Sequence, residues 1–233
     1  LDIAVDPLEG TNFTAKNLPN ALSVLAVSTK GSLLHAPDMY MEKIAIGPSL
    51  PENLVDLDFS VEKNIKLLCE AKNSSPEKLT ACVLNRPRHN SIIQDLKSMN
   101  VNISFITDGD VSGVISVSSP KSKIDIFLGI GGGPEGVLAA SALDAFDCNF
   151  QCKFLFETKK DIERAKLMGI DDLNKKYQLN EIVSGDSIFC ATGVTTGDLV
   201  SGIVIEGNEF ISETLITHKS TGLKKIVKTK QKI

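Results

Sequence analysis

The sequence Val5-Asp-Pro-Leu-Glu-Gly-Thr11 places two carboxylates on one sharp turn, directly behind an apolar run of strand length. Unpaired carboxylates that lie close together repel each other and are costly to desolvate, so a positive partner is expected between Asp6 and Glu9. Oxygen ligands favour a hard divalent cation such as Mg²⁺ or Mn²⁺. The turn therefore predicts a metal site where a strand gives way to a helix. A surface turn that only caps the helix is the alternative that this short stretch leaves open.

Gly10 and Thr11 close the same turn, and a helix is expected to begin near Thr11. The first backbone N–H groups of a helix, together with a threonine hydroxyl, are favourable for binding an anion. A cation site beside such an anion site has the composition of a centre for phosphoryl transfer.

The bulk composition restricts the class of protein. The chain has 233 residues, of which 42% are apolar and 23% charged, as is typical of a soluble globular protein. Its formal net charge of -4 disfavours nucleic acid and anionic membranes as partners. No apolar run is long enough to cross a bilayer and no secretory leader is evident, so we expect a cytoplasmic protein. The five cysteines form no Cys-x-x-Cys pair, which predicts buried free thiols.

Apolar runs of strand length alternate with amphipathic stretches, which predicts a layered α/β fold in a single domain over residues 1–233. The Pro- and Asn-rich stretch 47–58 is a predicted connection and a candidate boundary between layers. The chain opens inside an apparent strand without an initiator methionine, so we expect that a segment of the protein precedes Leu1.

The expected elements follow from periodicity and from turn residues. Strands are predicted over residues 3–5, 22–27, 32–35, 79–84, 102–106, 124–128, 153–156 and 187–191. Helices are predicted over residues 61–72, 89–99, 111–117, 135–146 and 162–168, the first of them with Ser60 as its N-cap. Near the C-terminus, residues 199–206 and 209–216 flank Gly207-Asn208 and predict a β-hairpin. The basic tail 224–232 predicts a last strand that frays into solvent.

A glycine-rich stretch, residues 129–136, connects a predicted strand to a predicted helix. Such a turn lets the backbone approach a phosphate closely, so a dinucleotide site is one interpretation. Against it, Glu135 places a negative charge where a diphosphate would lie. Glu135 is either a partner of the helix dipole or a third ligand of the predicted metal site.

Two further loops follow predicted strands. Arg86 and Arg88 present bidentate forks for a phosphate, although a solvated loop is the alternative. Asp108 and Asp110 are able to accept hydrogen bonds from sugar hydroxyls or to cap the next helix. His89 is interpreted as a capping or surface residue rather than as a general base. Because all these loops follow strands, we expect them to converge on one rim of the sheet.

Taken together, these motifs resemble a known family. The sequence Asp6-Pro-Leu-Glu-Gly-Thr11 resembles the metal signature of the lithium-sensitive, magnesium-dependent phosphatase superfamily. Further blocks in family order are residues 35–43 (HAPDMYMEK), 86–89 (RPRH), 108–110 (DGD), 129–136 (GIGGGPEG) and 191–198 (ATGVTTGD). These blocks narrow the resemblance to the bacterial-type class II fructose-1,6-bisphosphatases, several of which also take sedoheptulose 1,7-bisphosphate.

The resemblance implies a set of roles for residues of this chain. The residues that match metal ligands are Asp6, Glu9 and Glu135. Those that match substrate contacts are Glu9, Gly10, Thr11, Tyr40, Arg86, Pro87, Arg88, Asp108, Gly109, Asp110 and Gly132. The catalytic set comprises Asp6, Glu9, Thr11 and Glu135. The implied fold is a layered α/β/α/β/α sandwich that lacks its N-terminal part, the cofactor is Mn²⁺ or Mg²⁺, and the assembly is a homo-oligomer.

The function implied is metal-assisted hydrolysis of the 1-phosphate of a ketose bisphosphate, within carbohydrate metabolism. A first alternative is a non-catalytic fragment that binds a sugar phosphate or joins an oligomer. A second is a nucleotide-binding domain built on the glycine-rich stretch.

Overall fold

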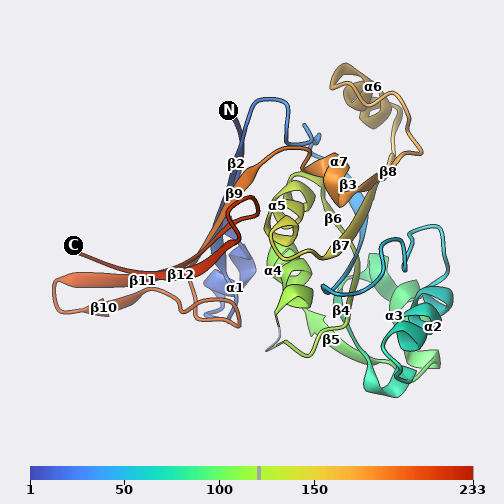
Figure 1. Cartoon of the computed structure of the whole chain (residues 1–233), viewed down its shortest axis with the longest axis horizontal. Coiled ribbons are helices and arrows are strands. Elements are labelled where there is room, and N and C mark those ends of the chain that lie inside the picture. Colours follow the sequence, from blue (N-terminus) through green and yellow to red (C-terminus); the bar gives the residue numbers. More distant parts are fainter. Residues whose placement is uncertain (120–121, 233) are drawn as a thin grey trace.

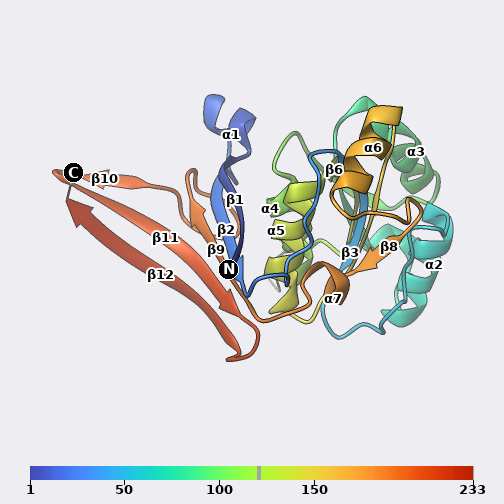
Figure 2. The same cartoon turned by 90° about the horizontal axis from the view of Figure 1, so that it is seen from above.

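The computed structural model describes residues 1–119 and 122–232, and within them the chain forms two six-stranded sheets separated by helices (Figures 1 and 2). The first, here called the antiparallel sheet, has the strand order β1-β2-β9-β11-β10, with β12 paired to β11. Its strands are β1 (Asp2–Glu9), β2 (Leu22–Ser28), β9 (Ser187–Gly193), β10 (Val204–Glu206), β11 (Glu209–His218) and β12 (Leu223–Lys232).

The second, here called the mixed sheet, has the order β5-β4-β6-β3-β7-β8. Its strands are β3 (Tyr40–Ile46), β4 (Thr80–Leu84), β5 (Asn102–Ile106), β6 (Ile126–Gly132), β7 (Asn149–Phe154) and β8 (Lys176–Gln178). Strand β4 runs parallel to β5 and β6, whereas β3 runs antiparallel to β6. The start of β3 therefore lies at the same edge as the ends of β4, β5 and β6.

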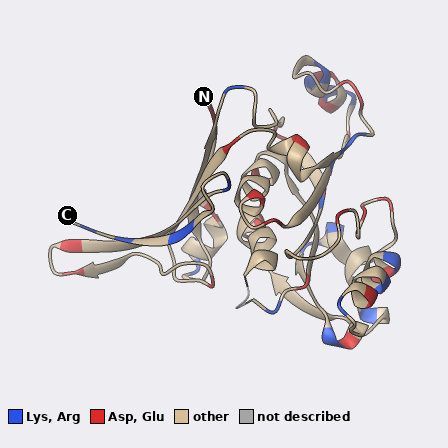
Figure 3. Cartoon of the chain, viewed as in Figure 1, with Lys and Arg blue, Asp and Glu red and all other residues tan. Residues whose placement is uncertain are grey.

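Helices α4 (Asp110–Ile115) and α5 (Gly133–Asp144) lie between the two sheets (Figure 2). Helix α5 is apolar on nearly all sides, as a helix enclosed by two sheets must be. Leu138 and Ala142 pack with Leu22 and Phe189 of the antiparallel sheet. The charged residues of these two helices are acidic only, and most other charges lie at the periphery of the molecule (Figure 3).

Helices α2 (Val61–Ala71) and α3 (Asn90–Ser98) cover the other face of the mixed sheet. Helix α2 begins as predicted, because the Ser60 hydroxyl accepts a hydrogen bond from the Lys63 N–H. The remaining helices are α1 (Thr11–Ala15), α6 (Lys159–Leu167), α7 (Leu179–Ile182) and the 3₁₀ turns η1 (Pro76–Lys78), η2 (Pro87–His89) and η3 (Ser116–Ser118).

The layered α/β class is confirmed. Of the five layers that the resemblance implies, the described residues form four: sheet, helices, sheet, helices. The face of the antiparallel sheet turned away from α5 exposes Ile3, Val5 and Ile188. None of the described helices combines the length and the apolar character that crossing a membrane requires.

Several element boundaries differ from the prediction. Residues 32–35 form no strand beyond one bridge, from Leu33 to Val183, whereas β3 was not predicted at all. Strand β1 runs through the acidic turn to Glu9, with an irregular register between Asp6 and Glu9. Strand β6 extends through the first half of the glycine-rich stretch, to Gly132.

The remaining predictions concern the C-terminal part and the connections. The predicted hairpin around Gly207 is present, with this glycine at φ 63°. The basic tail is paired to β11 as far as Lys232 and does not fray. Strand β7 begins and ends before the predicted strand 153–156 does. Residues 47–58 connect β3 to α2, and their role as a boundary stays a prediction.

Candidate active site

One cavity of about 520 Å³ gathers the loops that the sequence expected to converge. It lies at the edge where β1, β4, β5 and β6 end and β3 begins. All the predicted site residues except Pro87 line it, together with Leu8, Leu84 and Gly131. The structure therefore brings Asp6 and Glu135 to one cavity, although 129 positions separate them along the chain.

The acidic turn is shaped by its own hydrogen bonds. An oxygen of Asp6, Oδ1, accepts the Leu8 N–H at 3.0 Å, which closes the turn locally. Glu9 is buried, and its Oε1 accepts the Val111 N–H of α4 at 2.8 Å. Glu9 therefore joins the antiparallel sheet to the first turn of α4.

Among the residues that the structure describes, none supplies a positive partner for Glu9. Its Oε2 is buried without a hydrogen bond among the described residues. The pKa of Glu9 is raised to about 8, chiefly by burial and also by the nearby carboxylates of Asp110, Asp6 and Asp108, although the Val111 hydrogen bond acts to lower it. Such a carboxyl is held as an acid unless a cation enters the cavity.

A phenylalanine joins the two loops that carry these acids. Gly10 and Gly109 precede α1 and α4, and both have a left-handed backbone, with φ near 79° and 78°. A Cβ atom on either glycine would come within 2.7 Å or 2.5 Å of the Phe13 ring. The Asn12 N–H also donates to Asp108 Oδ2 at 2.9 Å. The sequence did not indicate Phe13 as a site residue, but its ring fixes the spacing of the two loops.

The arginine loop is attached to β6 at a single residue. The Arg88 Nε donates to the Ile130 carbonyl at 3.0 Å, and the Ile130 N–H donates to His89 Nε2 at 2.7 Å. The Arg88 guanidinium also stacks over Tyr40, 4.8 Å from the ring centroid. Arg86 lies nearer the acids, with its Nη2 at 3.9 Å from Asp108 Oδ1.

His89 occupies the N-cap position of α3, as the sequence suggested, but it is not a surface residue. Its side chain makes no capping hydrogen bond and is fully buried. Burial lowers the pKa of His89, and the neighbouring Arg88 lowers it further. His89 is therefore a neutral acceptor that holds the arginine loop against β6.

Lys43 of β3 was missed from the sequence as a site residue. Its side chain is fully buried, forms an ion pair with Asp110, and donates to the Gly132 carbonyl at 2.7 Å. A recognised strand at residues 40–46 would have revealed it, because that strand pairs with β6 and its start lies at the site edge.

The glycine-rich stretch is not a loop that surrounds a ligand. Residues 129–132 belong to strand β6, and Glu135 turns back over Gly132, where a Cβ atom would lie 2.0 Å from Glu135 Oε2. The carboxylate thus occupies the approach to the helix start that a dinucleotide phosphate would need. This geometry disfavours the nucleotide-binding interpretation.

The donor chemistry of the cavity suits an oxygen-preferring cation. Five carboxylates line it, and two buried carboxylate oxygens, Glu9 Oε2 and Asp110 Oδ1, have no hydrogen-bond partner among the described residues. However, residues 1–119 and 122–232 contain no group of three acidic, His or Cys side chains already close enough together to hold an ion. The carboxylates are gathered at the cavity but are not drawn into a finished ligand set.

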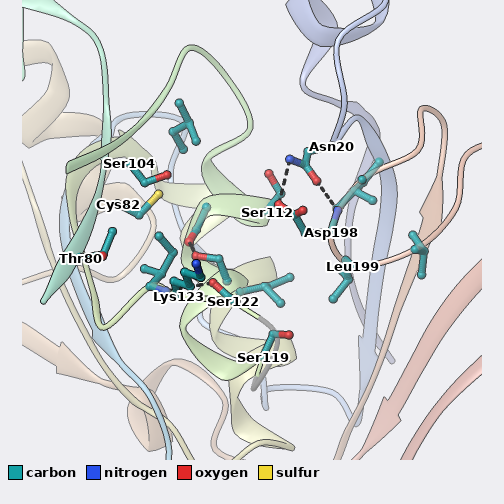
Figure 4. A pocket seen from close by; sticks show the side chains of 18 residues that line it. Asn20, Thr80, Cys82, Ser104, Ser112, Ser119, Ser122, Lys123, Asp198 and Leu199 are labelled. Carbon is teal, nitrogen blue, oxygen red and sulfur yellow. Dashed lines mark hydrogen bonds between the residues drawn. The ribbon is translucent and has the colours of Figure 1, made fainter. Parts of the chain in front are cut away.

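A second cavity, of about 600 Å³, lies beside α4 (Figure 4). Its walls are serine hydroxyls and aliphatic side chains, and Asn20 is hydrogen-bonded to Asp198 at its rim. Asp198 is the one carboxylate among its described lining residues. Cys82 also lines it, but burial raises the pKa of this thiol to about 12, so it is not a nucleophile. Among the described residues that line this cavity there is no arginine and no carboxylate besides Asp198, so it does not have the clustered acids and arginines that phosphoryl transfer needs.

The architecture places the chain among α/β proteins with a phosphatase-type fold. The sequence profile of a family described as bacterial fructose-1,6-bisphosphatase, glpX-encoded, matches residues 1–231. The chain belongs to this family, and the resemblance noted from the motifs is confirmed.

Individual relatives agree with this assignment. The fructose-1,6-bisphosphatase 1 class 2 of Escherichia coli (strain K12) is 39% identical over 241 residues, which span 97% of this chain and 71% of the relative. The fructose-1,6-bisphosphatase class 2 of Haemophilus influenzae is 37% identical over 240 residues, spanning 97% of this chain and 72% of the relative. The D-fructose 1,6-bisphosphatase class 2/sedoheptulose 1,7-bisphosphatase of Trichodesmium erythraeum is 36% identical over 242 residues, spanning 98% and 70%.

Proposed function

We propose that this protein hydrolyses the 1-phosphate of fructose 1,6-bisphosphate with the help of a divalent cation, giving fructose 6-phosphate and inorganic phosphate. The observation that carries this proposal is the shared cavity, which is lined both by the acids of β1, α4 and α5 and by Arg86 and Arg88. Charges of both signs on the walls of one cavity suit a substrate with two phosphates and a polyol between them.

Different residues of the cavity contact different parts of the substrate. Arg86 and Arg88 bind the distal phosphate, and the contacts of Arg88 with Ile130 and Tyr40 orient its guanidinium. Asp108 and Asp110 accept hydrogen bonds from sugar hydroxyls. Binding energy at the distal phosphate helps to position the reacting phosphate at the other end.

The reacting phosphate lies beside Glu9, Gly10 and Thr11. Asp6, Glu9 and Glu135 hold the cation, for which Mn²⁺ and Mg²⁺ are the candidates. When bound, it supplies Lewis-acid stabilisation of phosphoryl charge and acidifies water. The Thr11 hydroxyl donates to a phosphoryl oxygen. No serine or cysteine is among the described residues that line the cavity, which supports direct attack by water rather than a covalent enzyme intermediate.

The test is release of inorganic phosphate from fructose 1,6-bisphosphate in the presence of Mn²⁺. Glu135→Gln is expected to lower kcat/KM by about 100-fold or more, because it removes a charged cation ligand at the reacting phosphate. Glu62→Gln, on the exposed face of α2, is the matched control and should retain activity. Normal turnover by Glu135→Gln would overturn the assignment of this ligand.

A second candidate function is binding of a sugar phosphate without hydrolysis. It is favoured by one observation, the lack of an assembled three-ligand group within the described residues. Calorimetry that detects fructose 1,6-bisphosphate binding, combined with no phosphate release at any Mn²⁺ or Mg²⁺ concentration, would favour this candidate. Phosphate release would dismiss it.

Three finer points belong to the same proposal. Sedoheptulose 1,7-bisphosphate is a second candidate substrate, since its reacting end has the same ketose phosphate. The assembly is a homo-oligomer, and its place in the cell is the cytoplasm. Relative kcat/KM values for the two bisphosphates and the mass of the particle in solution test the first two points.

A further inference from the structure

Lys43 is among the largest fully buried side chains of the described residues. Its stem passes beneath the first turn of α5, where a Cβ atom on Gly136 would lie 3.3 Å from Lys43 Cε. A buried ammonium group is costly unless it is paired and hydrogen-bonded. Lys43 meets this requirement through the Asp110 carboxylate and the Gly132 carbonyl.

Both partners of Lys43 line the cavity, but Lys43 itself does not. Asp110 begins α4, and Gly132 is the last residue of β6 before α5. One ammonium group therefore ties together the starts of the two helices that lie between the sheets. Lys43 is therefore able to affect substrate binding only through Asp110 and Gly132.

The two oxygens of Asp110 are in different situations. Oδ2 is engaged by Lys43, whereas Oδ1 is buried without a partner among the described residues. The carboxylate also lies against Gly131, where a Cβ atom would be 2.2 Å from Oδ2. Asp110, which lines the cavity, is thus held through one oxygen, and its other oxygen is buried with its acceptor capacity unused among the described residues.

We infer that Lys43 is a positioning residue for recognition of the sugar, holding Asp110 and the Gly132 carbonyl so that they accept hydrogen bonds from the hydroxyls of a ketose phosphate. This inference rests on the proposed function. It assigns Lys43 no part in phosphate binding, because the arginine loop is attached separately, through Ile130. Loss of Lys43 therefore weakens recognition of the sugar more than recognition of phosphate.

The experiment compares two ligands on the same protein by calorimetry without added metal. Fructose 6-phosphate reports on sugar and phosphate together, and inorganic phosphate reports on phosphate alone. For Lys43→Met, the Kd of fructose 6-phosphate is expected to rise about ten-fold or more, which corresponds to about 1.4 kcal/mol, the size of a lost hydrogen bond to a charged group. The Kd of inorganic phosphate should change by less than about two-fold.

A second variant covers the case in which Lys43→Met leaves Asp110 as a lone buried charge and prevents folding. Lys43→Met combined with Asp110→Asn removes both charges, so the protein should fold. Its reference is Asp110→Asn alone, because Asp110 is itself a proposed sugar contact; adding Lys43→Met to Asp110→Asn should raise the Kd of fructose 6-phosphate by less than it does in the unaltered protein, since Lys43 acts through Asp110. Lys176→Met is the matched control, since it removes an ion pair with Asp56 and Asp58 at the far end of the mixed sheet. It should leave both Kd values unchanged.

The possible outcomes test the role of Lys43 and the proposed function separately. An unchanged Kd for fructose 6-phosphate in a folded Lys43 variant would overturn the positioning role. An equal rise in the Kd of fructose 6-phosphate and of inorganic phosphate would also overturn it, because the effect would then be general rather than specific to the sugar. Failure of the unaltered protein to bind fructose 6-phosphate, or to release phosphate from the bisphosphate with Mn²⁺, would instead overturn the proposed function and the inference with it.

Discussion

Glu9 shows how one residue links electrostatics to stability. Its folded-state pKa of about 8 lies above the ordinary value of 4.5, so the folded protein holds this proton more tightly than the unfolded chain does. The stability that Glu9 contributes is fully present below pH 4.5 and is lost as the pH rises through 8. Ionisation of this buried, unpaired carboxyl therefore destabilises the folded protein.

We predict that Glu9→Gln is more stable than the unaltered protein at pH 8.5 in EDTA, by a few kcal/mol at most. The difference should shrink toward zero at pH 5, where Glu9 is protonated in the folded state. Thermal unfolding at the two pH values measures it. Equal melting temperatures at pH 8.5 would show that Glu9 is not held as a buried acid.

Arg88 is a second residue whose side-chain geometry matters more than its charge. Its Nε bond to Ile130 and its stacking over Tyr40 require a planar guanidinium, which a lysine cannot supply. Arg88→Lys is expected to raise KM for fructose 1,6-bisphosphate about ten-fold with a smaller change in kcat. Arg164→Lys on α6 makes the same replacement at an arginine that is not among the lining residues of the cavity, and it should behave as the unaltered protein. An equal KM for both variants would contradict the role of Arg88.

At the scale of elements, the 3₁₀ turn η2 depends on one histidine. His89 accepts the Ile130 N–H, and its pKa is lowered, so its contribution to stability is present above the unfolded pKa near 6.5 and is lost as the pH falls below it. His89→Ala should cost about 1–3 kcal/mol at pH 8, because it leaves a buried N–H without an acceptor.

The same variant should lose less stability than the unaltered protein between pH 6.5 and pH 4.5. Denaturant unfolding at three pH values measures both effects. If the free energy of unfolding changed with pH in the same way in both proteins, His89 would not be held in a buried neutral form.

The limits of the sequence prediction also lie at this scale. Arg86, Arg88 and Asp108 were placed correctly just after strands, because apolar runs followed by turn residues are easily recognised. Asp6, expected to follow a strand, lies inside β1, which continues to Glu9. Strand β3 was missed because it is central and largely buried, so its residues do not alternate, and a charged Lys43 interrupts the apolar run. The pairing of Lys43 with Asp110 joins residues 67 positions apart and depends on sheet order, which no local pattern contains.

Conversely, residues 32–35 have the composition of a strand but are used for packing. Leu33 and Leu34 lie against the core, and the segment forms one bridge instead of a ladder. Strand β8 and helix α7 have three and four residues, which is too short for periodicity to indicate them. Tertiary contacts, not local propensity, determine the secondary structure of these segments.

At the scale of the whole molecule, the candidate ligands come from different layers. Asp6 and Glu9 belong to the antiparallel sheet, whereas Glu135 belongs to α5, which lies between the sheets. A cation held by all three would connect these layers, in addition to neutralising the unpaired Glu9 carboxylate. Since the ligands are gathered but not assembled, binding is expected to draw them together and to stabilise the folded state.

We therefore predict that Mn²⁺ raises the melting temperature at pH 8. At about 100 times its Kd, a ligand that binds only the folded state contributes about 2.7 kcal/mol, or roughly 5–10 °C for a chain of this size. Glu135→Gln should lose most of this shift, whereas Glu62→Gln should keep it, because Glu62 pairs with Lys66 on the surface of α2. Differential scanning calorimetry with and without Mn²⁺ measures the shift. If Glu135→Gln kept the whole shift, the cation would be bound by one layer alone, and the connection between sheet and helix would not be part of the site.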